Sequence, residues 1–418
     1  MDIRAPQVTA LTDAVRALLR FEHPADAVMR AWFREHPDLG ARDRALVADT
    51  AFGILRHLRR LQHLAPDQAP RKLVLAWMVL QQGRAVRSIE SMLSKDETAW
   101  LEQMKGHKED LPPAVELSLP DWLFDLMVQE FAPDDLTALG RALLEPAPLD
   151  LRVNTLLTRR EDVLASLAAS GVEATPCALS PMGVRLREKP ALERHELFTS
   201  GHVEVQDEGS QLVSILTDVR RGQMVVDFCA GAGGKTLALG ALMRSEGRLY
   251  AFDTNERRLT QFKPRLKRSG LSNVHPQLID TESDVRVKRL AGKIDRVLVD
   301  APCSGTGTLR RNPDIKWRMK PGAIDELRAK QASILHAAAR LPKVGGRLVY
   351  ATCSLLRTEN EGAVEDFLTL HPGWEIVDAP DILRKAGVAL DAPGPHLRLY
   401  PHLNGTDGFF AAVLERKA

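Results

Sequence analysis

The chain has 418 residues, a hydrophobic content of 44% and a formal net charge of +2. This length leaves room for two or three domains, and the hydrophobic content excludes wholesale disorder. The nearly balanced charge does not indicate a particular kind of binding partner. The longest uncharged apolar run, Leu73 to Gly83, is about half as long as a membrane-spanning helix.

The cysteines indicate the compartment. Cys177, Cys229, Cys303 and Cys353 are too few for a disulfide framework, and no two have metal-clip spacing. The first residues show no charged-then-apolar signal pattern. We therefore expect free thiols in a cytoplasmic, monomeric protein that uses no metal and no membrane.

Residues 1–145 are predicted to form a helical accessory domain. Val8, Leu11, Val15 and Leu18 recur at helical spacing, and Val47–Leu58 shows the same periodicity. Leu73–Leu80 is apolar nearly all round, as a central buried helix would be.

Residues 146–205 are predicted to form a small α/β subdomain. Leu149–Asn154 and Gly183–Leu186 are typical of strands. Between them, Thr158 and Glu161 have the spacing of a capping box in front of a helix.

Residues 206–418 alternate between strands and helices, which predicts a Rossmann-like α/β domain with a doubly wound, mostly parallel sheet. The expected strands are Met224–Phe228, Arg248–Asp253, Pro276–Asp280, Arg296–Asp300, Arg347–Thr352 and Phe409–Leu414. The expected helices include Lys235–Met243, Glu256–Ser269 and Asp325–Leu341.

A glycine-rich turn follows the first strand of that domain, in Asp227-Phe-Cys-Ala-Gly-Ala-Gly-Gly-Lys-Thr236. Glycines between a strand and a helix let the backbone approach a ligand closely. Asp253 ends the second strand, where an acid can accept from a ribose hydroxyl pair. A nucleoside-containing cofactor is expected, although these features do not separate S-adenosylmethionine from a nicotinamide dinucleotide.

Two cysteines follow later strands, in Asp300-Ala-Pro-Cys303 and Thr352-Cys353. The carboxyl ends of parallel strands meet at one rim, so both should lie beside the glycine turn. A thiolate that adds to carbon 6 of cytosine makes carbon 5 nucleophilic toward a methyl group. Asp300 is expected to bond to the ring at nitrogen 3 and the exocyclic amine, and Lys235 to supply positive charge.

A basic excess points to a polyanion. Between Glu256 and Lys320 the sequence has 16 Lys and Arg residues but only 7 Asp and Glu residues. RNA contacts are expected from Arg257–Arg268, Arg286–Lys293 and Arg310–Lys320.

The C-terminal two thirds of the chain resembles the RNA (cytosine-5) methyltransferases of the Sun/Nop group. The matching motifs are Gln206–Gln211, Asp300–Gly305, Arg310–Trp317, Thr352–Ser354, Glu359–Glu361 and Asp407–Phe410. The resemblance implies that Cys353 is the nucleophile and that Cys303 assists product release. It implies S-adenosyl-L-methionine as cofactor, with Asp253 at the ribose and Asp280 at the adenine. The remaining expected cofactor contacts are Asp227, Cys229, Ala230, Gly231, Ala232, Gly233, Gly234, Lys235, Arg258 and Asp300.

The N-terminal region is similar, more sparsely, to the NusB-like domain of the bacterial 16S ribosomal RNA enzyme. Arg42–Leu46, Gly53–Arg56 and Leu119–Leu123 carry this likeness, which favours 16S ribosomal RNA as the substrate. The cofactor turn departs from the family, because Ala230-Gly-Ala-Gly-Gly-Lys-Thr236 has no proline. We expect a more flexible turn from this change.

Three other functions remain open at this point. A nicotinamide-dependent dehydrogenase would explain the glycine turn and Asp253 but leaves both cysteines without a role. A non-catalytic RNA-binding factor for ribosome assembly would not need them either. The same chemistry could also act on transfer RNA or DNA.

Overall fold

The structure is a computed structural model that describes residues 3–65, 67–106, 110–390 and 393–418. Its chain divides into two units, one of residues 1–146 with 308–321 and one of residues 147–307 with 322–418. Residues 308–321 were predicted to belong to the C-terminal domain, but in the structure they pack with the N-terminal helices.

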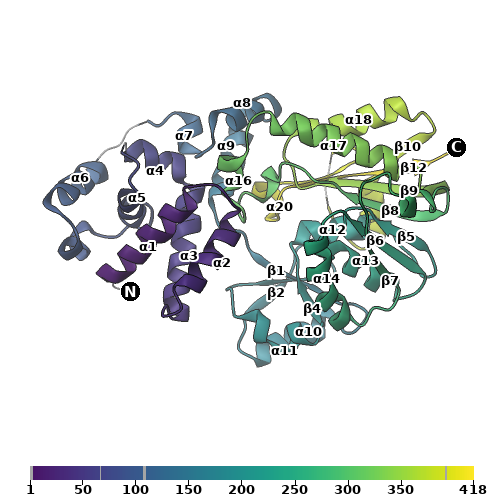
Figure 1. Cartoon of the computed structure of the whole chain (residues 1–418), viewed down its shortest axis with the longest axis horizontal. Helices are drawn as coiled ribbons and strands as arrows, with labels where there is room; N and C mark the ends of the chain where they lie inside the picture. Colours follow the sequence, from purple (N-terminus) through teal and green to yellow (C-terminus); the bar gives the residue numbers. More distant parts are fainter. Residues whose placement is uncertain (1–2, 66, 107–109, 391–392) are drawn as a thin grey trace. The chain divides into compact units, whose positions relative to one another are not determined.

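The first unit is helical in its described residues (Figure 1). Val8, Leu11, Val15 and Leu18 are buried on one face of α1, as their spacing predicts, and Leu73–Ala76 is fully buried. Its elements are α1 (Ala5–Leu18), α2 (Ala25–Glu35), α3 (Ala41–Arg56), α4 (Leu58–Leu64), α5 (Pro70–Ala76), η1 (Trp77–Gln81), η2 (Val86–Ser88), η3 (Glu90–Met92), α6 (Lys95–Gly106), α7 (Pro113–Glu116), α8 (Asp121–Glu130), α9 (Pro133–Leu144) and α16 (Ile315–Arg318).

The α16 segment is held by carbonyl groups of the helical unit. The ammonium of Lys316 is buried and donates to the backbone oxygens of Arg56, at 2.9 Å, and Ser118, at 2.7 Å. The indole of Trp317 donates to the backbone oxygen of Leu55. Lys316 therefore serves the packing of this segment, and the expectation that it contacts RNA is wrong, because a buried amine cannot reach a phosphate.

A small antiparallel sheet opens the second unit, with strand order β2-β3-β1-β4. Its strands are β1 (Leu149–Val153), β2 (Ala174–Pro176), β3 (Gly183–Leu186) and β4 (Val203–Val205), and its helices are α10 (Arg160–Ala169) and α11 (Glu196–Thr199), with η4 at Leu192–Arg194. The predicted capping box is wrong, because α10 begins at Arg160 with Arg159 as its N-cap, which leaves Thr158 one residue too early.

The large sheet has the order β10-β12-β9-β8-β5-β6-β7, and β11 pairs with β12. Strands β9, β8, β5, β6 and β7 run parallel, and β12 is antiparallel to β9, as the mostly parallel prediction requires. The strands are β5 (Met224–Asp227), β6 (Arg248–Asp253), β7 (Val274–Leu278), β8 (Ile294–Asp300), β9 (Pro342–Thr352), β10 (Trp374–Val377), β11 (Leu397–Leu399) and β12 (Phe409–Arg416).

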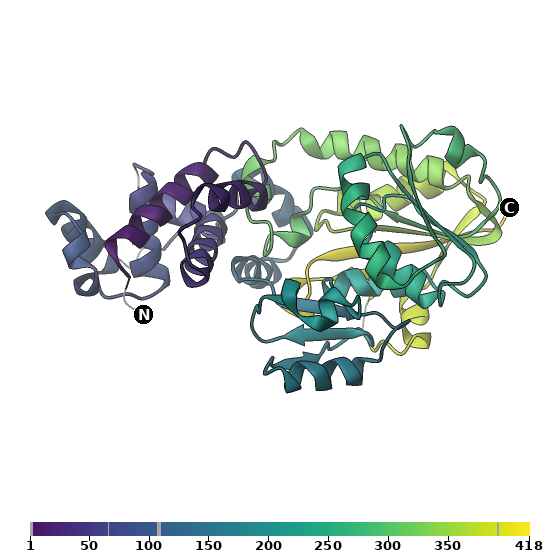
Figure 2. The ribbon, with the colours of Figure 1, turned by 60° about the horizontal axis from the view of Figure 1, so that its bottom comes forward.

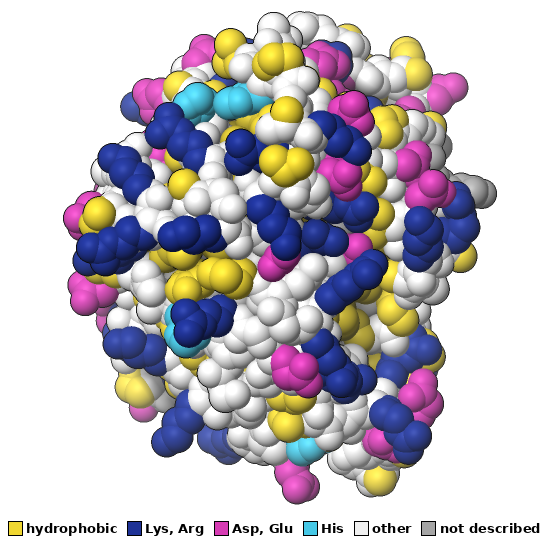
Figure 3. Space-filling model, turned by 90° about the vertical axis from the view of Figure 1, so that its right-hand side faces the viewer, with side chains coloured by type: hydrophobic (Ala, Val, Ile, Leu, Met, Phe, Trp, Pro, Cys, Tyr) yellow, Lys and Arg dark blue, Asp and Glu magenta, His cyan; other side chains and the backbone are white. Residues whose placement is uncertain are grey.

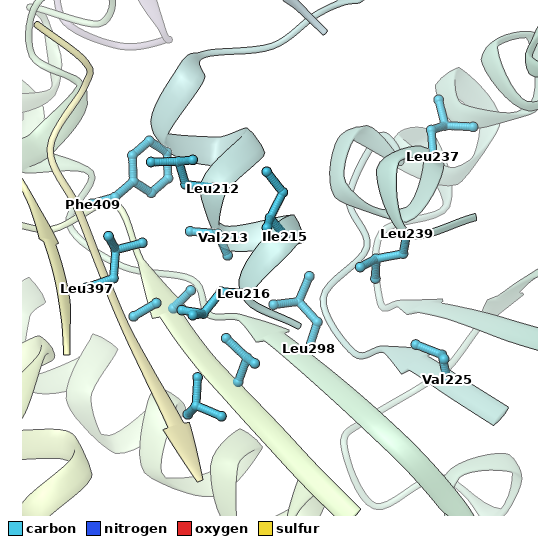
Figure 4. Packing of buried hydrophobic residues seen from close by; sticks show 14 of the residues in the cluster. Leu212, Val213, Ile215, Leu216, Val225, Leu237, Leu239, Leu298, Leu397 and Phe409 are labelled. Carbon is cyan, nitrogen blue, oxygen red and sulfur yellow. The ribbon is translucent and has the colours of Figure 1, made fainter. Parts of the chain in front are cut away.

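Helices cover both faces of this sheet (Figures 1 and 2). Helices α12, α13 and α19 pack on one face, where Leu212 and Leu216 meet Leu298 and Phe409 (Figure 4). Helices α17 and α18 cover the other. The helices and short turns are α12 (Glu208–Leu216), α13 (Gly234–Leu242), α14 (Glu256–Ser269), α15 (Val285–Lys288), η5 (Thr306–Thr308), α17 (Ala323–Ala338), η6 (Arg357–Glu359), α18 (Glu361–Leu370), α19 (Ala379–Lys385) and α20 (Pro401–Asn404).

Among the described residues, no helix combines the length and the apolar character needed to cross a membrane.

Candidate active site

A cavity of about 700 Å³ lies at the carboxyl ends of the parallel strands. Asp227, Asp253 and Asp300 end β5, β6 and β8, and all three line it. The strand order reverses at β5, which has β6 on one side and β8 on the other. Such switch points leave a crevice for ligands in doubly wound sheets.

Most of the residues predicted for the site line this one cavity. They are Asp227, Cys229, Ala230, Gly231, Ala232, Gly234, Lys235, Asp253, Arg258, Asp300, Cys303 and Cys353. Gly233 and Asp280 are not among the lining residues. Gly233 packs under the turn, where a Cβ would meet the ring of Phe262 at 2.0 Å. Asp280 is exposed, and its backbone N–H donates to Asp284.

Other residues that line the cavity were not predicted as site residues from the sequence. They are Val205, Gln206, Ser210, Thr254, Arg265, Ile279, Glu282, Lys330 and Ile334. Gln206 and Ser210 belong to a motif already noted for its resemblance. Glu282 and Lys330 carry no motif, and they form an ion pair of 2.9 Å between the segment after β7 and helix α17.

Two side chains, those of Asp253 and Arg265, hold the backbone of the turn after β5. Asp253 accepts from the N–H groups of Gly231 and Asn255, at 2.8 and 2.7 Å. Arg265 donates to the backbone oxygen of Ala232. Gly231 has a φ of 56°, with open space where a Cβ would stand, and glycine adopts this conformation without strain.

Asp227 is a buried carboxylate with one unsatisfied oxygen. The hydroxyl of Thr236 donates to Oδ2 at 2.6 Å, while Oδ1 has no hydrogen-bond partner in the structure. Burial raises the pKa of Asp227 to about 7, against the hydrogen bond from Thr236, which lowers it. A buried acceptor without a partner costs free energy, so this oxygen suits a cationic ligand group.

Lys235 and Asp300 form an ion pair at the centre of the cavity, with Nζ and Oδ2 2.7 Å apart. Burial opposes the charge of the amine, but the carboxylate of Asp300 outweighs it and raises the pKa of Lys235. The lysine therefore stays protonated beside the carboxylate.

The two cysteines predicted to act together do meet. Cys303 and Cys353 are 50 residues apart in the chain, and their sulfur atoms are 3.5 Å apart. The hydrogen bond with Cys353 and burial raise the pKa of the Cys303 thiol well above its ordinary value. Cys303 is therefore the proton-holding partner when Cys353 is a thiolate.

The other cysteines are poor nucleophiles. Cys229 lines the cavity, but burial raises the pKa of its thiol. Cys177 lies with Asp150 and Glu208 in a buried group whose ligand atoms are within 4.8 Å of one another. Arg185 already pairs with both carboxylates, at 2.7 and 3.4 Å, and burial raises the pKa of the Cys177 thiol. This ion pairing and the protonated thiol make the group a structural network rather than a metal centre.

Some cations of the basic stretches form ion pairs within the protein. Arg265 and Arg268 both pair with the buried Glu204, at 2.8 and 2.6 Å. Arg257, Lys263 and Lys267, on the same helix, are exposed. Figure 3 shows Lys and Arg side chains across the middle of one face of the molecule, with acidic side chains between them. The exposed cations of α14 and those of residues 286–293 are therefore open to a polyanion.

Family models match two parts of the chain. Residues 214–415 match the model for the 16S rRNA methyltransferase RsmB/F, and residues 119–193 match a ferredoxin-like domain of RsmF/B-like methyltransferases.

Relatives align over much longer stretches. The chain is 29% identical to the probable ribosomal RNA small subunit methyltransferase B of Bacillus subtilis, over 97% of this chain and 98% of that protein. It is 35% identical to the protein of the same name from Synechocystis, over 74% and 69%. Among solved structures, the crystal structure of PH0851 superposes with a TM-score of 0.79 and 27% identity, over 100% of both chains.

Proposed function

Because this chain belongs to the RsmB/F family of methyltransferases, we propose that it transfers a methyl group from S-adenosylmethionine to carbon 5 of a cytosine in 16S ribosomal RNA. The observation that carries this proposal is the pair of cysteine sulfurs, 3.5 Å apart at the rim that also holds the glycine turn. We further propose that it acts in the cytoplasm, where bacterial ribosomes are assembled.

The cavity fits the proposed cofactor on its own chemistry. The unpartnered Oδ1 of Asp227 suits the ammonium of the methionine part, and Asp253 suits the ribose hydroxyls. Gly231 and Gly234 leave open space where a side chain would stand, since the nearest atom to a Cβ on Gly234 lies 4.0 Å away. When bound, S-adenosylmethionine supplies an electrophilic methyl group.

In the proposed reaction, Cys353 attacks the cytosine as a thiolate. Addition of its sulfur to carbon 6 makes carbon 5 nucleophilic toward the methyl group. A base then takes the carbon 5 hydrogen as a proton, which restores the 5,6 double bond and expels Cys353 as a thiolate. We assign this base to Cys303, because the hydrogen bond and the charge of Cys353 that raise its pKa are lost while Cys353 is bonded to carbon 6. Cys303, in contact with that sulfur, takes part in this release step.

Asp300 and Lys235 are proposed to handle the charge that develops on the ring. Addition at carbon 6 places electron density on nitrogen 3 and the exocyclic groups. The protonated Lys235 supplies the positive charge that stabilises this density, while Asp300 accepts from the exocyclic amine and orients the ring beside it. Because the pair is formed before substrate arrives, little reorganisation is needed during the reaction.

The rest of the chain is proposed to serve RNA binding. We assign residues 1–145 to a NusB-like accessory domain, onto which 308–321 packs, 146–205 to the small α/β subdomain and the rest of 206–418 to the catalytic domain. The exposed cations of α14, Arg257, Lys263 and Lys267, are proposed contacts for the RNA backbone.

Bisulfite sequencing of RNA from cells with and without the gene tests the proposal. We expect one or more cytosines of 16S ribosomal RNA to lose protection from conversion when the gene is absent. Loss of protection in transfer RNA alone would favour the alternative substrate. No change in either RNA would favour a non-catalytic assembly factor.

Replacing Asp253 with alanine should weaken S-adenosylmethionine binding about ten- to a hundredfold, because a charge-assisted hydrogen bond contributes about 1.5–3 kcal/mol. Titration calorimetry with the pure protein measures this. Asp366→Ala is the matched control, since Asp366 is exposed on α18 and does not line this cavity, and its affinity should stay within twofold of the wild type. An unchanged affinity in Asp253→Ala would remove Asp253 from the site.

Cofactor affinity should fall at acidic pH because of Asp227. A cationic ligand group requires the ionised carboxylate, and the pKa of Asp227 is about 7. The fraction of ionised Asp227 therefore shrinks as pH falls below 7, and the apparent Kd should rise about tenfold between pH 8 and pH 6. In Asp227→Asn the affinity should be lower at pH 8 and this rise should vanish. Equal slopes in both proteins would contradict the assignment.

A further inference from the structure

A buried carboxylate outside the cavity joins the two cysteine loops. Glu359, the last residue of η6, has no solvent exposure and does not line the cavity. Oε1 accepts from the backbone N–H of Ser304 and from the side chain of Gln331, both at 2.9 Å. Oε2 accepts from the hydroxyl of Ser354. Ser304 and Ser354 are the residues that directly follow Cys303 and Cys353.

Further hydrogen bonds tighten the same junction. Gln331 also donates to the backbone oxygen of Pro302, so the loop is held on both sides of Cys303. The hydroxyls of Ser304 and Ser354 are 3.1 Å apart, and the N–H of Gly307 donates to the backbone oxygen of Cys353. The backbone of both loops is thereby fixed without any contact from the sulfur atoms themselves.

We propose that Glu359 is the positioning residue of the cysteine pair, whose carboxylate ties the Cys303 loop to the Cys353 loop and sets the distance between the two sulfurs. This inference rests on the proposed cysteine chemistry for its effect on turnover. Its structural part, the holding of the two loops, stands independently of RNA.

The chemistry of the junction requires a carboxylate. All three partners of Glu359 are donors, and an ionised carboxylate is the side chain that only accepts. A glutamine of the same shape could keep its oxygen toward Ser304 and Gln331, but its NH₂ group would then meet Ser354, whose hydroxyl would have to accept instead of donate. Burying the charge is costly, and the three donated hydrogen bonds offset that cost.

The charge of Glu359 also acts on the thiol. After the hydrogen bond with Cys353, burial and the charge of Cys353, the negative charge of Glu359 is a further cause that raises the pKa of Cys303. Glu359 therefore helps to keep Cys303 protonated while Cys353 is free to attack.

Three substitutions in the full-length protein test the proposal: Glu359→Ala, Glu359→Gln and the control Glu365→Gln. Glu365 is an exposed glutamate of α18 that pairs with Arg357. In Glu359→Ala, kcat for RNA methylation should fall about a hundredfold, because small misplacements of reacting groups have effects of that size. The KM for RNA and the Kd for S-adenosylmethionine should stay within twofold, and Glu359→Gln should show a smaller fall in kcat. Glu365→Gln should match the wild type.

A second measurement needs no RNA. The rate of Cys303 alkylation by iodoacetamide at pH 8, followed by mass spectrometry of the peptide, should rise in Glu359→Gln, since loss of the negative charge removes one cause that raises the pKa of Cys303. An unchanged kcat, a parallel loss of cofactor affinity, or an unchanged alkylation rate would overturn the positioning role. If the wild type makes no 5-methylcytidine, the proposed function fails, and the alkylation rates still decide whether Glu359 acts on Cys303. Should Glu359→Ala not fold, Glu359→Gln alone gives both readouts.

Discussion

Replacing Cys353 with alanine should abolish both the covalent protein–RNA complex and the methylated product. Without the sulfur that adds to carbon 6, carbon 5 stays a poor nucleophile and the covalent route is closed. Transfer of labelled methyl groups to RNA, together with denaturing electrophoresis, measures both quantities. The fall in product should reach the detection limit of the assay.

Cys303→Ala should give the opposite pattern. Its Cys353 still attacks and the ring is still methylated, but the release step is impaired. A covalent adduct should therefore accumulate and survive denaturing electrophoresis. The contact between the two sulfurs fits this assignment, because it places Cys303 beside the carbon–sulfur bond that must break.

The reverse assignment makes a distinct prediction. DNA cytosine methyltransferases use a Pro-Cys nucleophile, and Cys303 follows Pro302. If Cys303 were the nucleophile, the adduct would build up in Cys353→Ala and be absent in Cys303→Ala. Cys177→Ala serves as the control, since Cys177 does not line the cavity and should show normal turnover without an adduct.

Asp300→Asn should lower kcat about a hundred- to a thousandfold, the range seen when one preorganised electrostatic group is removed from an active site. The neutral amide keeps the shape of the side chain but loses the ion pair with Lys235 and one of the two acceptor oxygens. Single-turnover methylation with saturating RNA and cofactor isolates this step from binding.

The matched control for Asp300→Asn lies on the same strand. Asp295 stands near the start of β8, away from the cavity, where it pairs with Lys343 and accepts from the N–H of Met224. Asp295→Asn should retain kcat within about threefold, since a partly exposed ion pair contributes little. Similar losses in both variants would mean that β8 is perturbed as a whole and that Asp300 has no special role.

The fold was predictable where the local pattern was long. Strand Arg248–Asp253 and helix Glu256–Ser269 end where the sequence indicates, because a buried apolar run and an amphipathic helix each give a sustained signal. Strand β9 begins at Pro342 instead of Arg347, since the chain passes through Gly345 and Gly346 without leaving the sheet. The three-residue strands β2, β4 and β11 were not predicted, because three residues are too few to show an alternation.

The sequence by itself determined which residues lie at the rim. Parallel strands end at one edge of a sheet, so the placement of Asp227, Asp253, Asp300 and the two cysteine loops followed from the order of strands. The proposed chemistry also came from the sequence, because the two cysteine motifs, the glycine turn and Asp300 together resemble the Sun/Nop methyltransferases.

Only the tertiary structure decided what depends on distant segments meeting. The 3.5 Å between Cys303 and Cys353, the carboxylate of Glu359 behind them and the Glu282–Lys330 ion pair all join residues far apart in the chain. The structure also buried Lys316 in the helical unit and left Asp280 outside the cavity. A charge pattern shows that such side chains are ionisable, but burial and hydrogen-bond partners, which arise only on packing, decide whether they face a ligand, solvent or the protein's own backbone.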